Sequence, residues 1–156
     1  MPETQPIAKN RKARREYEIL DIFECGLMLR GSEVKSLRDG KVQLAESFAR
    51  VVSGEIFLYG MHISPYSHAS THVQLDPTRE RKLLLHKWEI NRIQARVAQD
   101  RLTLIPLSLY FLNGRAKVEL GLAKGLKLHD QRQKIAKRDA DREARRALSV
   151  RQRSQT

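Results

Sequence analysis

Three histidines lie close together in the chain and are the first residues whose spacing could support chemistry. On a helix, His68 and His72 would share one face, as zinc ligands do, with His62 a few residues earlier. The stretch between positions 65 and 77 is instead rich in proline, serine and threonine, which favours a loop, and its first acidic residue is Asp76. We therefore expect three imidazoles on a loop or the surface, with no metal ion and no other cofactor.

The sequence also gives no support for nucleophilic catalysis or phosphate transfer. The sequence lacks a paired-carboxylate site, a glycine-rich phosphate loop and a nucleophile elbow. Its single cysteine, Cys25, follows Glu24 in a predicted strand without an activating histidine nearby, and is expected to be a structural thiol. One cysteine cannot form an internal disulfide, and no stretch resembles a membrane span or a signal peptide. We expect a cytoplasmic protein that is not an enzyme.

The distribution of charge is the clearest sign of a partner. The 156 residues contain 30 Lys and Arg against 18 Asp and Glu, a net charge of +12. Residues 9–15 hold five cations and no anions, and residues 127–156 hold ten cations and four anions, whereas residues 16–126 are nearly neutral. Cations that neutralise phosphates release counterions, so two basic ends favour a polyanion partner. The alternative is that the basic ends only aid solubility.

Most of the central part is predicted to form strands. Asn113-Gly114 is the favoured pair for a two-residue hairpin turn. The register that this turn sets pairs apolar residues on one face: Phe111 with Ala116, Leu109 with Val118, and Leu107 with Leu120. A second hairpin has Ser53-Gly54 at its tip.

Two strands change the phase of their apolar alternation. In the first, Leu20 and Ile22 have even numbers and Leu27 and Leu29 have odd ones, with Cys25-Gly26 between them; in the second, the change falls at Pro106. A shift of one residue is typical of a β-bulge, and bulges bend strands. Because long bent strands curl a small sheet, we predict a mainly β fold built on a closed or partly closed antiparallel barrel.

Two helices are expected beside the strands. The first, at 32–39, has Ser32 as its predicted N-cap, Glu33 in its first turn, and Gly40 in the left-handed position after its end. It has an apolar stripe and a cationic stripe, which are Val34 with Leu37 and Lys35 with Arg38.

The second helix, near 86–99, has Ile90, Ile93 and Val97 at helical spacing. The run Leu83-Leu84-Leu85 before it can be a buried strand, or one leucine can point outward as an apolar contact.

Residues 127–156 contain no aromatic residue and few large apolar ones, too few to offset the entropy of ordering. Acidic residues nevertheless precede basic ones by four positions, as in Asp130 with Lys134 and Asp141 with Arg145, which supports a helix. We expect a tail that is disordered when free and helical when laid along a polyanion.

Several segments together resemble the SmpB family, whose members bind transfer-messenger RNA. These segments are NRKAR, FECGLML, GSEVKSLRDGK, DPTRERKLLLHKWEI and LYF…KVELGLAKG, and the resemblance runs from Asn10 to Arg142. It implies an OB-like β-barrel with peripheral helices in a bacterial protein. It also implies binding to the tRNA-like domain of transfer-messenger RNA and delivery of that RNA to the A site of stalled ribosomes, with peptide tagging by trans-translation.

The resemblance also implies site residues. Those expected to bind RNA are Asn10, Arg11, Lys12, Arg14, Glu24, Lys35, Arg38 and Leu84. Asn10, Glu24 and Leu84 match RNA-contacting positions of the family, and the cations would contact phosphates. Leu84 can equally be a core residue, and Glu33 is expected only to start its helix.

The tail is expected to enter the empty mRNA channel near the decoding centre of the small subunit. Its implied ribosome contacts are Lys127, His129, Asp130, Arg132, Lys134, Lys137 and Arg138. The chain departs from the family's pattern where Leu126 and Gln131 replace lysines, which weakens phosphate contact at those two points.

We therefore expect a basic N-terminal arm at 1–15, an RNA-binding barrel at 16–126 and a basic tail at 127–156, in a monomer without a membrane partner. The alternative is a ribosomal or generic single-strand RNA-binding barrel. That class needs a platform of exposed aromatic residues, and Tyr110 is the only clear outward candidate.

Overall fold

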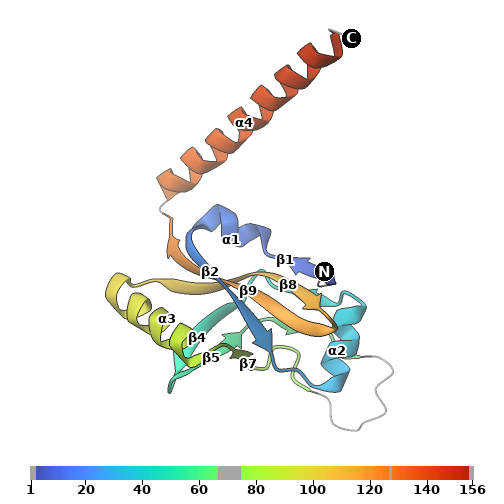
Figure 1. Ribbon diagram of the computed structural model, residues 1–156, viewed down its shortest axis with the longest axis vertical. Helices are drawn as coiled ribbons and strands as arrows, with labels where there is room; N and C mark the ends of the chain where they lie inside the picture. The colour runs from blue at the N-terminus through green and yellow to red at the C-terminus, as the bar shows by residue number, and fades with distance from the viewer. Residues whose placement is uncertain (1–2, 67–74, 127, 155–156) are drawn as a thin grey trace. The chain divides into compact units, whose positions relative to one another are not determined.

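In the computed structural model of the protein, residues 3–66, 75–126 and 128–154 are described (Figure 1). The chain divides into two compact units, Met1–Gly125 and Leu126–Thr156. The strands are β1 (Thr4–Lys9), β2 (Tyr17–Leu27), β3 (Val42–Gln43), β4 (Phe48–Val52), β5 (Glu55–Tyr59), β6 (His62–Ile63), β7 (Arg81–Leu84), β8 (Thr103–Leu112) and β9 (Arg115–Gly125). The helices are α1 (Arg11–Glu16), α2 (Gly31–Arg38), α3 (Lys87–Asp100) and α4 (Leu128–Ser154).

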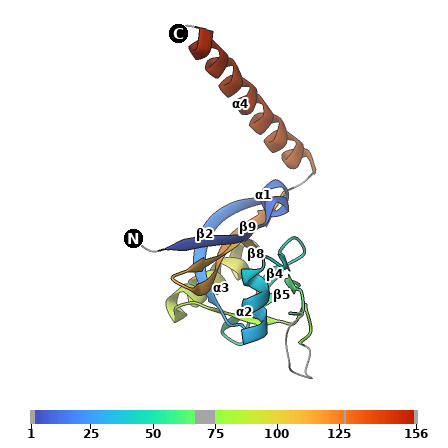
Figure 2. The ribbon, with the colours of Figure 1, turned by 90° about the vertical axis from the view of Figure 1, so that its right-hand side faces the viewer.

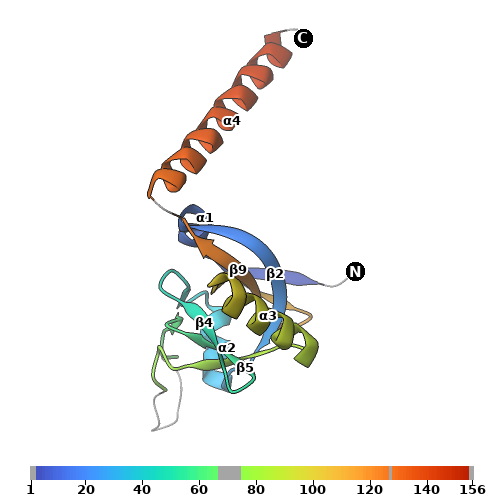
Figure 3. The same ribbon diagram turned by 90° about the vertical axis from the view of Figure 1, so that its left-hand side faces the viewer.

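A closed antiparallel ring of strands forms the body of the first unit. The sheet runs in the order β1-β8-β4-β5-β7-β2-β9, and β9 pairs in turn with β8. In Figure 1, β2 and β9 cross the near side of the ring, with β4 and β5 behind them. Helix α2 comes to the front in Figure 2 and α3 in Figure 3, so the two helices lie on opposite sides of the ring. The predicted mainly β, antiparallel fold with short peripheral helices is confirmed.

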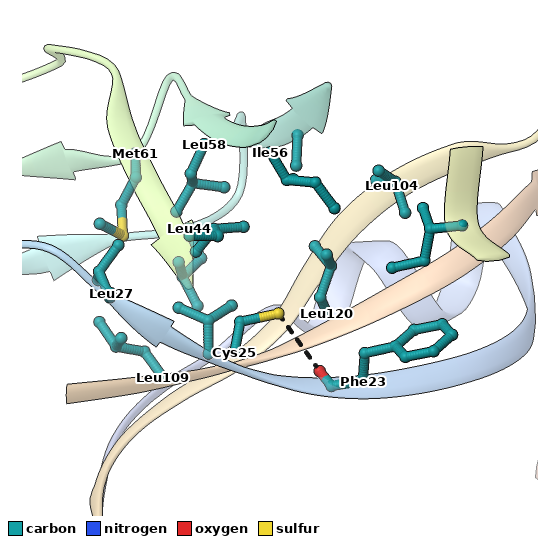
Figure 4. Packing of buried hydrophobic residues seen from close by; sticks show 14 of the residues in the cluster. Phe23, Cys25, Leu27, Leu44, Ile56, Leu58, Met61, Leu104, Leu109 and Leu120 are labelled. Carbon is teal, nitrogen blue, oxygen red and sulfur yellow. Dashed lines mark hydrogen bonds between the residues drawn. The ribbon is translucent and has the colours of Figure 1, made fainter. Parts of the chain in front are cut away.

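Alternate side chains of the strands fill the inside of the ring. Phe23, Cys25 and Leu27 of β2 pack in one cluster with Leu58 and Met61 (Figure 4). Cys25, Leu58 and Met61 have no exposed surface. Burying one apolar side chain of this size stabilises a fold by about 1.5–3 kcal/mol, so this cluster holds the ring together. Cys25 is packed as expected of a structural thiol.

The β8–β9 hairpin has the predicted turn and, near the turn, the predicted register. Phe111 lies opposite Ala116, and Leu109 opposite Val118. The predicted pairing of Leu107 with Leu120 is wrong, because Leu120 lies opposite Pro106 and the register shifts between Pro106 and Ser108. Leu107 is the extra residue of this bulge, and it packs under α1 in a second small apolar cluster.

Strand β2 differs from the prediction in the position of its irregularity. Cys25 and Gly26 pair without a break with Val118 and Lys117, and the register shift lies between Ile19 and Asp21. The even-numbered Leu20 and Ile22 do not point inward: they are 41% and 47% exposed. The apparent phase change at Cys25-Gly26 arose because two outward apolar residues looked like core positions.

Helix α2 begins one residue earlier than predicted, and its cap is different. Arg30 is the N-cap residue, and its backbone N–H donates to Glu33 Oε1 at 2.8 Å, so the predicted cap, Ser32, is wrong. Gly40 takes the left-handed conformation, with φ +71°. The two stripes are confirmed, because Leu37 is buried and Lys35 is exposed. In α3, Ile90 and Ile93 are buried as predicted.

The N-terminal and C-terminal basic segments are structured differently from one another. Residues of the N-terminal segment form β1, which pairs with β8, and α1, which packs against β2 and β8. Helix α4 belongs to the second unit, and its side chains from 135 to 148 are exposed. Among the residues that the structure describes, no helix is long and apolar enough to cross a membrane.

Candidate nucleic-acid interface

Asn10 fixes the start of α1 against the ring of strands. Its side chain is 4% exposed, and its Oδ1 accepts a hydrogen bond from the Ala13 N–H at 3.2 Å. Its Nδ2 donates to the Pro106 carbonyl at 2.9 Å. The carboxamide therefore caps the helix and ties it to β8, where the β8 bulge begins. Asn10 lies inside the protein, and its contacts orient α1.

The cations of α1 reach the surface around this anchor. Arg11 is exposed, and Arg14 Nη2 lies 3.4 Å from Glu119 Oε1 on β9. Lys12 Nζ donates to Glu46 Oε1 at 3.1 Å. This hydrogen bond, together with the charge of Glu16, raises the pKa of Lys12 above its ordinary value.

Two carboxylates lie directly opposite each other on the outer face of the sheet. Glu24 of β2 is the cross-strand partner of Glu119 on β9. Like charges in this position destabilise a sheet, but each has a compensating donor: the Tyr110 hydroxyl donates to Glu24, and Arg14 pairs with Glu119. Burial and the bond to Glu24 raise the pKa of the Tyr110 phenol. Glu24 is thus oriented by a neutral donor.

Leu84 points away from the core. It is 47% exposed, and it lies opposite Gly26 on β2. A Cβ at Gly26 would lie 3.1 Å from the Leu84 Cβ, so the glycine leaves the space that Leu84 occupies. Of the two alternatives for this leucine, the structure has the outward one.

Leu84 and Glu24 line the same groove, which has a volume of about 630 Å³. Other side chains along it include His86, Phe111, Arg115 and Lys117. Glu89 lines it as well, so the groove combines an exposed leucine, two carboxylates and two cations.

The cationic stripe of α2 borders this groove. Arg38 Cζ lies 5.4 Å from the centre of the Phe111 ring, and Phe111 lines the groove. Lys35 Nζ lies 5.5 Å from the centre of the Tyr66 ring. Both cations are exposed, so they remain open to a phosphate while the aromatic faces hold them in place.

The position of α2 depends on a buried network that the sequence did not reveal. Glu33 accepts from Arg81 Nε at 2.7 Å and from Arg79 Nε at 3.1 Å. Burial alone would raise the pKa of Glu33, but hydrogen bonds from Arg79, the Arg30 backbone and Arg81 hold it below its ordinary value. Glu33 was expected only to start a helix. The residues that it joins are more than forty positions away, so no local pattern could have identified them.

The whole-chain comparison decides the family. The profile described as SmpB protein matches residues 7–150. The chain belongs to the SmpB family. The SsrA-binding protein of Acetivibrio thermocellus is 53% identical over 146 residues, covering 94% of each chain. That of Pelotomaculum thermopropionicum is 54% identical over 147 residues, covering 94% of this chain and 95% of the relative.

A solved structure of the SmpB family is similar as well. It is a chain of "tmRNA-SmpB: a journey to the center of the bacterial ribosome", which is 51% identical with a TM-score of 0.65. The match covers 79% of this chain and 86% of that one.

Not all of the expected SmpB site residues meet at the groove. Glu24 and Leu84 line it and Arg38 borders it, whereas Asn10 and Lys12 line a separate depression beside Phe48 and Arg50. On α4, Arg132, Lys137 and Arg138 are exposed. Lys127 lies outside the described residues, as do His68 and His72, and the side chains of His129, Asp130 and Lys134 are not described. Within the described part, no three metal-ligating side chains gather.

Sequence reasoning also missed aromatic residues on the outer face of β4 and β5 in this SmpB chain. Phe48 and Tyr59 are cross-strand partners whose rings stack, with centroids 5.5 Å apart. Arg50 Cζ lies 5.0 Å from the Phe48 ring centre. Strand alternation was the signal that could have identified them, because Phe48 and Arg50 are two positions apart on β4 and so point to the same face of the sheet.

Proposed function

We propose that this chain binds the tRNA-like domain of transfer-messenger RNA and delivers it to the A site of stalled ribosomes for trans-translation. The observation that carries the proposal is the groove, where Leu84 and Glu24 stand beside Arg115 and Lys117 with Arg38 at the border. Family membership and the similar chain in a tmRNA-SmpB structure support the choice of RNA. The protein acts in the cytoplasm as a monomer, and it positions RNA without carrying out a covalent step.

In this proposal surface cations of α1 and α2, of which only Lys12 is half-buried, contact the phosphate backbone. They are Arg11, Lys12, Arg14, Lys35 and Arg38. They lie on two short helices that are held at their ends, α1 by Asn10 and α2 by Glu33. Asn10 then contributes by orienting α1 rather than by touching RNA. Rigid placement matters because a flexible lysine or arginine loses side-chain entropy on binding.

Glu24 and Leu84 are proposed to read features other than phosphate. Glu24, held by the Tyr110 hydroxyl, can accept from a base amino group. Leu84, nearly half exposed, offers an apolar contact to an unstacked base or a sugar. A phosphate would be repelled by Glu24, so the carboxylate favours a base edge at this point of the groove.

The test is a gel-shift competition between the tRNA-like domain and bulk tRNA, at several stated salt concentrations. We expect selective binding of the tRNA-like domain. Arg38→Ala should weaken binding and reduce the slope of log affinity against log salt by about 1, because one phosphate contact is lost. Lys124→Ala is the matched control, since Lys124 is an exposed cation on β9 that lines neither the groove nor the depression at Lys12. Equal affinity for both RNAs contradicts the proposal.

A second candidate function is general single-strand RNA binding through the outer face of β4 and β5. The observation that favours it is the stack of Phe48 on Tyr59 with Arg50 over Phe48. Arg50→Ala, compared with Arg38→Ala, separates the two candidates. If Arg50→Ala weakens binding and Arg38→Ala does not, and oligouridine competes as well as the tRNA-like domain, the second function is the correct one.

The tail is proposed to act on the ribosome. Exposed cations on α4, such as Arg132 and Lys137, would contact the empty mRNA channel of the small subunit, with His129 and Asp130 near the decoding centre. Leu126 and Gln131 stand where the family's usual lysines would make further phosphate contacts, so we propose fewer ionic contacts at this point of the tail.

A further inference from the structure

Trp88 is an exposed tryptophan at the start of α3. It is 62% exposed, and the residues that α3 buries are Ile90 and Ile93. The Trp88 ring lies nearly parallel to that of His86, with an interplanar angle of 8° and centroids 6.4 Å apart. The core does not use this indole, so its large aromatic surface is available to a partner.

This aromatic pair continues the groove. His86 lines the groove together with Leu84 and Glu24, and Trp88 follows His86 by two residues. The backbone there is fixed, because the His86 N–H donates to Glu89 Oε1 at 3.0 Å. Lys87, between the two aromatic residues, is exposed. Two exposed apolar residues, Leu84 in the groove and Trp88 just beyond it, therefore lie within five positions of the chain, and a cation precedes Trp88.

We propose that Trp88 stacks on an unpaired nucleobase of the RNA that occupies the groove, with the His86 ring beside it. The inference rests on the proposed function and adds to it a specific base contact. A base in a duplex has both faces covered by its neighbours, so the ligand is a nucleotide in a loop, a bulge or an end. Two exposed cations beside the groove, Lys87 and Arg38, favour a phosphate-bearing occupant over a basic protein segment.

The chain offers a direct measurement, because Trp88 is its single tryptophan. All tryptophan fluorescence of the protein therefore comes from this site. On titration with the tRNA-like domain, we expect quenching of the emission and, in the complex, reduced collisional quenching by acrylamide. Stacking brings the indole face to face with a base and shields it from the solvent, which accounts for both changes.

Substitutions test whether the contact contributes to binding. Trp88→Ala should weaken binding of the tRNA-like domain between about 5-fold and 150-fold, as removal of a stacked base contact does. Trp88→Phe should retain most of the affinity, and neither variant should change the salt slope, since no phosphate contact is lost. Val52→Ala is the matched control, because Val52 is another exposed apolar residue, 42% exposed, at the end of β4. An exposed position in the first turn of a helix tolerates alanine without loss of the fold.

The outcomes separate this inference from the proposed function. Selective binding of the tRNA-like domain, with unchanged tryptophan emission and wild-type affinity in Trp88→Ala, overturns the stacking contact and leaves the proposed function standing. Loss of selectivity between the tRNA-like domain and bulk tRNA overturns both. If RNA-free ribosomal proteins quench Trp88 and the RNA does not, the occupant is a protein and the inference is wrong.

Discussion

Glu33 of α2 and Arg81 of β7 form an ion pair inside the protein: Arg81 Nε donates to Glu33 Oε2 at 2.7 Å, and the two residues are 4% and 1% exposed. The other nitrogens of Arg81 donate to the carbonyls of Met61 and Pro77, at 2.7 and 3.0 Å. One arginine thus links the start of α2 to β7 and to the segments before β7. The network holds Lys35 and Arg38 at the border of the groove.

Removing one partner of this pair should destabilise the fold strongly. Arg81→Met leaves the Glu33 carboxylate buried, with only Arg79 and the Arg30 backbone N–H to balance its charge. Such a change lowers the free energy of unfolding by about 3–5 kcal/mol. Urea denaturation measures this free energy of unfolding for the variant and the wild type. The control is Lys82→Met, which removes the neighbouring half-exposed pair of Lys82 with Glu55, 2.8 Å apart, and should change stability by at most about 1 kcal/mol. Equal stabilities of the two variants would contradict a structural role for the network.

The same carboxylate predicts a dependence of stability on acid. The pKa of Glu33 is lower in the folded protein than its ordinary value of about 4.3, because the hydrogen bonds outweigh burial. A lowered pKa gives stability that is fully present above the unfolded pKa and is lost as the pH falls through the folded pKa. Below about pH 4, urea midpoints of the wild type should therefore fall more steeply than those of Glu33→Gln. Parallel curves would show that Glu33 does not titrate as expected.

Local signals predicted the fold well, and long-range packing accounts for the errors. The β8–β9 hairpin was predictable because Asn113-Gly114 and the flanking alternation are adjacent in sequence. The pairing of Leu107 with Leu120 was predicted wrongly, because Leu107 is the extra residue of a bulge. Leu107 packs under α1, which lies far away in the chain. Leu20 and Ile22 indicated a phase change at the wrong place, because alternation alone cannot say which side of a strand faces water.

The site was predictable only as a set of residue types. The cationic stripe of α2 followed from helical spacing, and Lys35 and Arg38 are indeed exposed. The burial of Asn10 and the pairing of Glu33 with Arg81 depend on contacts across 96 and 48 positions, which local patterns do not contain. Exposure of Leu84 likewise depended on Gly26 in the neighbouring strand.

The Tyr110 phenol should ionise at a higher pH than an ordinary tyrosine, whose pKa is about 10. Burial and the hydrogen bond to Glu24 both favour the neutral form. Its contribution to stability is therefore full below about pH 10 and is lost as the pH rises further, because the unfolded phenol ionises first. Spectrophotometric titration of the wild type against Tyr110→Phe isolates this one group. In Glu24→Gln the transition should move back toward the ordinary value; an unchanged transition would mean that Glu24 does not contribute.

Cys25 should be unreactive while the protein is folded. It has no exposed surface, and burial, assisted by the charges of Glu89 and Glu24, raises its pKa to about 12. The thiolate is the reactive form, so at pH 8 the raised pKa alone slows alkylation roughly a thousandfold. Iodoacetamide labelling followed by mass spectrometry should show modification only in urea. Rapid labelling of the native protein would mean that the strand pairs around β2 open readily.

The last prediction concerns the division of labour between the two units. Deletion of residues 127–156 should leave the affinity for the tRNA-like domain within about twofold of the wild type, because every residue that lines the groove belongs to the unit that ends at Gly125. Peptide tagging on stalled ribosomes should be lost, since the exposed cations of α4 are then missing.

Helix formation in the tail should also depend on binding to ribosomal RNA. All side chains of α4 from 135 to 148 are exposed, so the helix gains nothing from packing within its own segment and depends on intrinsic propensity, which is marginal for an isolated helix. Circular dichroism of a peptide spanning 127–156 should show little helix in plain buffer and more on addition of ribosomal RNA. A stable helix without RNA would contradict folding on binding. Loss of RNA affinity in the truncated protein would contradict the separation of the groove from the tail.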